Sequence, residues 1–124
     1  MTEKLYDKIK NSDDIRKEIV HVPQWDCDVE ARTMSGLERA MLLGGCIGKD
    51  GNVIQSKFQS GLLIACLHDP ETGEKLFSES DAEWLMGKSS GAIEKLASVA
   101  MRLSGLTKEA MEDAEKNSSQ DIPK

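Results

Sequence analysis

The sequence has few of the residues that build most binding and catalytic sites. Aromatic side chains make up 4% of its 124 residues, which include three cysteines, three prolines and two histidines. The cysteines form no CxxC pair, and an odd number cannot all be paired in disulfides. No apolar run approaches the roughly 18 residues that a membrane-spanning helix needs. These shortages argue against a disulfide-stapled secreted protein, a structural zinc site and a membrane protein.

Negative charge exceeds positive charge. The chain carries 16 Lys and Arg against 22 Asp and Glu, which gives a formal net charge of −6. Proteins that bind nucleic acid or an anionic membrane surface need basic side chains for the phosphates. We therefore expect neither partner. Residues 1–10 alternate charges around no apolar centre, unlike a signal peptide, so we expect the protein to stay in the cytoplasm where it is made.

No stretch of the sequence matches an enzyme motif. Gly44–Lys49 is similar to a phosphate-binding loop, but Asp50 follows the lysine where Ser or Thr is required, and a helix precedes the loop. His21 and His68 have no nucleophile motif around them. We predict that the protein is not an enzyme and uses no cofactor.

A metal site has little more support. His21 and Cys27 would share one hairpin, but they supply two ligands where structural zinc takes four. Three carboxylates, Asp26, Asp28 and Glu30, would lie on one face of a strand. Such a row could bind a hard cation, but it more often forms a solvated face of the sheet. A small metal-binding regulator therefore remains the weakest alternative.

The stretch from Ile19 to Glu38 carries the clearest pattern. Two strand-like runs meet at Pro23, and after the turn apolar and charged residues alternate, which places them on opposite faces of a strand. The apolar set is Trp25, Cys27, Val29 and Ala31. The pattern predicts a β-hairpin at about residues 16–33, with buried, reduced cysteines.

The rest of the chain has helical spacing. Helices are predicted at residues 35–45, 53–68, 78–86, 90–104 and 107–116, with a short turn of helix at residues 5–9 and a disordered tail at 117–124. A capping box from Ser35 to Glu38 begins the first long helix and places Leu37, Ala40, Met41 and Gly44 on one side.

The most apolar predicted helix, 53–68, should lie at the centre, packed against 35–45 and 90–104. The expected fold is a single α+β domain, residues 1–116, mostly helical with one N-terminal β-hairpin.

The hairpin and the helix start after it resemble the tail assembly chaperones of long-tailed bacteriophages and their prophage relatives. That family typically carries V-x-V-P-x-W, then x-V-x-V-R, then S/T-G-x-E-R. The matching residues here are Val20, Val22, Pro23 and Trp25, then Val29, Ala31 and Arg32, then Ser35, Gly36, Glu38 and Arg39. The similarity extends over residues 15–106 and departs at Asp26 and Cys27, where the family often has a glycine.

The resemblance implies a cytoplasmic chaperone that binds the tape measure protein and keeps it soluble during tail tube assembly. The implied partners are the tape measure protein and, as a second candidate, the tail tube protein; self-association is a third candidate interaction. Tryptophan is enriched at binding hot spots, and methionine adapts to varied apolar surfaces. The expected partner-binding residues are therefore Trp25, Trp84, Leu85 and Met86. A structural tail or connector protein is the main alternative.

Overall fold

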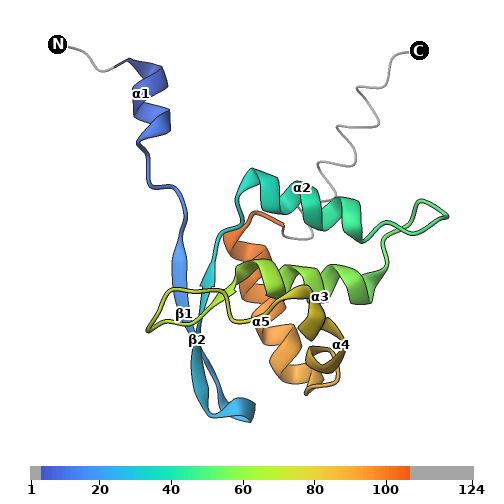
Figure 1. Ribbon diagram of the computed structural model, residues 1–124. Coiled ribbons are helices and arrows are strands. Elements are labelled where there is room, and N and C mark those ends of the chain that lie inside the picture. The colour runs from blue at the N-terminus through green and yellow to red at the C-terminus, as the bar shows by residue number, and fades with distance from the viewer. Residues whose placement is uncertain (1–3, 107–124) are drawn as a thin grey trace.

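The computed structural model describes residues 4–106, which contain five helices and a small antiparallel sheet, with most of the helices on one side of the sheet (Figure 1). This arrangement confirms a helix-dominated α+β fold. The predicted helix at 107–116 and tail at 117–124 lie outside the described residues. In chain order the elements are α1 (Leu5–Lys10), β1 (Lys17–Val22), the 3-10 turn η1 (Pro23–Trp25), β2 (Cys27–Arg32), α2 (Gly36–Gly45), α3 (Gln55–Cys66), β3 (Leu67–His68), the 3-10 turn η2 (Glu79–Asp81), α4 (Ala82–Leu85) and α5 (Ser90–Leu103).

The predicted hairpin is present and pairs β1 with β2 in the register Val20 to Val29. Alternate side chains of the two strands are buried beneath α5, as the period-two pattern requires. Asp26 closes the turn with φ of +48°, in the left-handed region that suits glycine. Asp26 stands where the chaperone family often has a glycine, and it adopts a conformation that a glycine would also adopt. Asp tolerates this conformation better than most residues do.

Two details of the predicted sheet are wrong. Cys27 is exposed, whereas the alternation placed it in the core with Cys46 and Cys66, which are indeed buried and free. The sheet also has a third strand, β3, at positions predicted to end the 53–68 helix. β3 pairs only with Glu30 and Ala31, whereas Cys27 lies at the turn end of β2, beyond the part of the strand that carries the buried Val29 and Ala31.

The helical core follows the expected arrangement. Helix α3 packs against both α2 and α5, and buries Phe58 and Leu62 almost completely. Helix α5 ends at Gly105, whose φ of +70° allows the N–H of Leu106 to bond the Met101 carbonyl at 2.7 Å. The side chain of Leu106 is fully buried, so the core continues to the last described residue.

Helix α2 leaves its predicted apolar side in solvent. Its capping box forms as expected: the N–H of Glu38 donates to Ser35 Oγ, and the Glu38 carboxylate accepts from the Ser35 N–H. The residue of α2 that is buried in the core is Leu42. The residues predicted to share one side of the helix, Leu37, Ala40, Met41 and Gly44, are exposed. We call these four residues the outer face of α2.

Candidate functional site

A groove runs between α2 and α3 and is closed on one side by the segment that leads into α4. Its volume is about 450 Å³. Helix α2 lines it with residues spaced i, i+3, i+4 and i+7, which fall on one side of a helix. The lining residues are Glu38, Met41, Leu42 and Gly45 from α2, Lys57, Ser60, Gly61, Ile64 and Ala65 from α3, and Lys75, Glu79 and Ala82 from the following segment. We call this the α2–α3 groove.

A glycine sets the distance between the two helices. A Cβ atom on Gly61 would lie 2.5 Å from Cδ1 of Leu42, closer than real Cβ contacts allow. The missing side chain therefore lets Leu42, the buried residue of α2, pack directly on the backbone of α3. Because α2 contacts α3 through Leu42, the other apolar residues of α2 are not covered by α3. Met41 lies at the groove, and Leu37 lies on the outer face.

The rim of the groove is charged. Lys75 Nζ lies 2.7 Å from Glu38 Oε2, which joins the start of α2 to the strand-like segment after β3. Partial burial by itself raises the pKa of the Glu38 carboxyl. The hydrogen bonds from Lys75 and the Ser35 amide, together with the Lys75 charge, outweigh burial and lower that pKa below its usual value. Glu38 is thus held as a carboxylate beside the apolar Met41.

The apolar side chains at this site are unusually open to solvent. Leu37 is 71% exposed and Met41 66% exposed. Burying side chains of this size is worth about 1.5–3 kcal/mol each, so a helix that covered them would gain appreciable free energy. The sequence pattern placed these residues on one side of the helix but gave no direction for that side, because an amphipathic helix has the same spacing whether its apolar side meets a core or a partner.

Trp84 forms a second exposed apolar position. Half of its surface is exposed, and its indole N–H donates to Asp81 Oδ1 at 3.0 Å. The Phe77 ring meets it edge to face, with centroids 5.8 Å apart. Donation from the Ser78 amide and from the indole lowers the pKa of the Asp81 carboxyl. These contacts fix the indole in place while leaving one side open.

The other three expected partner-binding residues are less accessible. Leu85 has no exposed surface, so it supports α4 and has none to offer a partner. Trp25 and Met86 are half-buried and pack against the core. None of the four expected partner-binding residues lines the α2–α3 groove. The groove therefore does not bring Trp25 together with Trp84, Leu85 and Met86.

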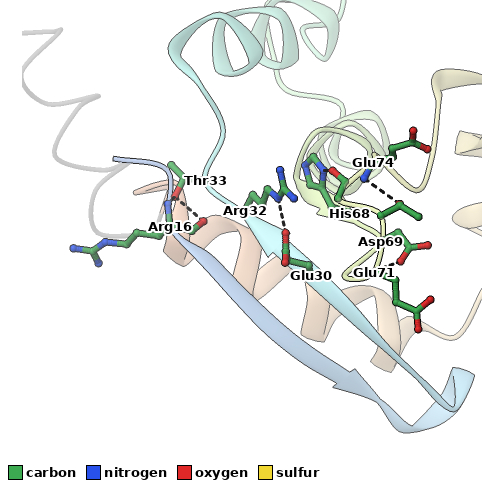
Figure 2. A network of polar contacts seen from close by, with 10 residues as sticks. Arg16, Glu30, Arg32, Thr33, His68, Asp69, Glu71 and Glu74 are labelled. Carbon is green, nitrogen blue, oxygen red and sulfur yellow. Dashed lines mark hydrogen bonds and ion pairs between the residues drawn. The ribbon is translucent and has the colours of Figure 1, made fainter. Parts of the chain in front are cut away.

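Histidine and acidic residues are engaged in local contacts. His21 Nδ1 lies 2.8 Å from Asp28 Oδ1, and both side chains are exposed. Figure 2 shows the opposite end of the sheet, where Arg32 donates to Glu30 and His68 lies beside the turn after β3. Among residues 4–106, no three His, Cys, Asp or Glu side chains gather closely enough to hold a metal ion.

The turn shown in Figure 2 is held by its own hydrogen bonds. The N–H of Asp69 donates to the Glu74 carbonyl at 2.8 Å, and the N–H of Glu71 donates to Asp69 Oδ1 at the same distance. Burial, reinforced by the positive charges of Arg32 and Lys75, lowers the pKa of His68. His68 therefore stays neutral near pH 7, and its Nδ1 lies 3.2 Å from the Gly73 carbonyl, which makes the cluster a structural one.

No protein-family model and no curated protein sequence matches the chain. Among solved structures, the chain is similar to the tail assembly chaperone of bacteriophage HK97. The TM-score is 0.57, the sequence identity is 21%, and the match covers 79% of this chain and 91% of that chain. The likeness therefore extends over most of both molecules, and it shows that the two share a fold.

Proposed function

We propose that this protein is a bacteriophage tail assembly chaperone that binds the tape measure protein and keeps it soluble while the tail tube is assembled. The observation that carries the proposal is the fold shared with the HK97 tail assembly chaperone over 91% of that chain. The hairpin and capping-box pattern of the sequence, which resembles the same family, supports it independently.

The surface suits this work. Tape measure proteins are long helical proteins, and an amphipathic helix binds by laying its apolar side into a groove. The α2–α3 groove extends along α2 from Glu38 to Gly45, about 10 Å at 1.5 Å per residue. That length fits two turns of a partner helix, which would cover Met41 and, at the edge, Leu37.

The proposal needs no catalytic step, cofactor or metal, and places the protein in the host bacterial cytoplasm. The tail tube protein is the expected second partner, whereas nucleic acid and membrane are not expected partners because the chain is acidic. Within residues 4–106, the helices are all too short or too polar to cross a membrane.

Co-expression with the tape measure protein of the same phage tests the proposal. We expect a larger soluble yield of the tape measure protein and a complex that co-purifies at moderate salt, because apolar burial is screened far less than charge pairing. The double variant Leu37→Ser, Met41→Ser should lose most of the complex. Ile19→Ser, which changes an apolar residue on β1 that is 54% exposed, is the matched control.

Two results would count against the proposal. An equally insoluble tape measure protein with and without this chain, together with no complex, would remove the chaperone role. Recovery of this chain from washed mature virions in tail-tube amounts would instead identify a structural tail protein. Loss of binding in Trp84→Ala but not in the α2 double variant would keep the function and move the site to α4.

A further inference from the structure

The most exposed large apolar side chains of the described residues lie on two helices. Leu5, Tyr6 and Ile9 of α1 are 71%, 70% and 65% exposed, and Leu37 and Met41 of α2 are 71% and 66% exposed. The next residue in this order, Ile19, is 54% exposed. Two uncovered apolar helix faces therefore occur in one short chain.

Helix α1 needs a surface to pack on. It has six residues and stands clear of the body (Figure 1). Isolated helices shorter than about 12–15 residues are marginal in water, because their few hydrogen bonds do not offset nucleation. The three apolar residues of α1 are spaced i, i+1 and i+4, which places them on one side. Burial of that side would supply the missing free energy.

The outer face of α2 has the shape that a second helix requires. Leu37, Ala40, Met41 and Gly44 are spaced i, i+3, i+4 and i+7, which forms one stripe along the helix. Two of the four are small, and nothing lies within 4 Å of a Cβ built on Gly44. A helix can therefore approach the α2 backbone closely between the larger Leu37 and Met41 side chains.

The chain joins these two helices at a common anchor. The N–H of Arg16 donates to Thr33 Oγ1 at 3.0 Å, and the N–H of Thr33 donates to the Arg16 carbonyl at 3.0 Å. Thr33 lies two residues before Ser35, the N-cap of α2. Residues 11–15, which link α1 to this anchor, span up to about 17 Å when extended. The C-terminal end of α1 is thus tethered near the N-terminal end of α2.

We propose that α1 is a tethered strap that closes over the outer face of α2 of the same chain, with the two helices antiparallel. That orientation opposes the helix dipoles and brings Lys10, in the last turn of α1, toward the first turn of α2, which carries Glu38. A short tether gives an effective concentration of about 1 mM. The same chain therefore outcompetes a second copy at micromolar concentration.

The strap covers Met41, which also lines the α2–α3 groove. A partner helix would have to displace α1, so removal of residues 1–10 should strengthen partner binding. This consequence rests on the proposed function, whereas the contact between α1 and α2 does not. The contact is therefore tested on the free protein.

Hydrogen exchange measured by NMR on the full chain provides the test. The amides of Lys8 to Asn11, which α1 bonds internally, should exchange at least about tenfold more slowly than in an unstructured chain, the factor that about 1.4 kcal/mol of docking free energy produces. Leu37→Ser with Met41→Ser should abolish this protection and leave α3 protected. Trp84→Ser, a change at an exposed apolar residue of α4, should leave α1 protected.

A reciprocal variant guards against local misfolding of α2. Leu5→Ser with Ile9→Ser should shift the methyl resonance of Met41 in an otherwise unchanged spectrum. Unprotected α1 amides in the full chain, or protection that survives the α2 double variant, would overturn the proposal. Protection that rises with protein concentration would also overturn it, because α1 would then be held by a second copy.

Discussion

Helices α2 and α3 lie side by side and have similar apolar content, yet their environments are opposite. Helix α3 buries Phe58, Leu62, Leu63 and Cys66 between α2 and α5. Helix α2 buries Leu42 alone and leaves Leu37 and Met41 in solvent. The contrast separates two uses of one amphipathic pattern: α3 uses apolar residues to hold the fold, and α2 keeps most of its own for another surface.

The difference in burial between α3 and α2 is tested by truncating one large side chain on each helix. Phe58 is 4% exposed, so Phe58→Ala should lower the free energy of unfolding by about 3–5 kcal/mol, through lost burial and a residual cavity. Met41→Ala should cost less than about 1 kcal/mol, because the side chain lies outside the core and loses at most its contact with the docked α1. Urea denaturation of both variants measures the difference, and equal costs would show that Met41 packs in the core.

Substitutions at two glycines should change stability by smaller amounts, one lowering it and the other raising it. Gly105 ends α5 at φ of +70°, so Gly105→Ala should destabilise the protein by about 1–2 kcal/mol through strain at Cβ. Gly44 lies in α2 in open space, so Gly44→Ala should stabilise by up to about 1 kcal/mol through helix propensity. Thermal melts of the two variants should move in opposite directions. A destabilising Gly44→Ala would mean that α1 docks so close to Gly44 that an added methyl group clashes with it.

The smallest effect concerns the ion pair that holds α2 to the segment after β3. The pKa of Glu38 is lowered in the folded protein, so the unfolded chain binds the proton more tightly. The resulting stability is present above the usual pKa of 4.5 and is lost as pH falls through the lower folded value. Relative to Glu38→Gln, the wild type should be favoured by less than about 1 kcal/mol at pH 7. That advantage should shrink below pH 4.5, and a pH-independent difference would show that the charge of Glu38 contributes nothing to stability.

Much of the local structure was predictable because it depends on neighbours in sequence. The Ser35 to Glu38 capping box and the hairpin turn near Pro23 both form as predicted. Each is decided by contacts within a few residues, which the sequence displays directly. The central place of α3 also followed, since a helix with an apolar surface over most of its girth must be covered.

The candidate site was predictable in part. Trp84 is half exposed, as a binding residue requires, but Leu85 beside it is fully buried, because consecutive residues of a helix point in different directions. The α2–α3 groove was not predicted. Its position depends on Gly61 meeting Leu42 across two helices, a contact between residues that no local pattern connects.

By itself, the sequence determined where most of the described helices lie, where the hairpin turns, and that the chain carries a formal net charge of −6. Tertiary structure alone decided which side of α2 is covered, that Leu67 and His68 leave α3 to form a third strand, and that Cys27 lies outside the core. The physical reason is one of range. Hydrogen bonds and caps act over three or four residues, whereas burial depends on the distant element that arrives to cover a face.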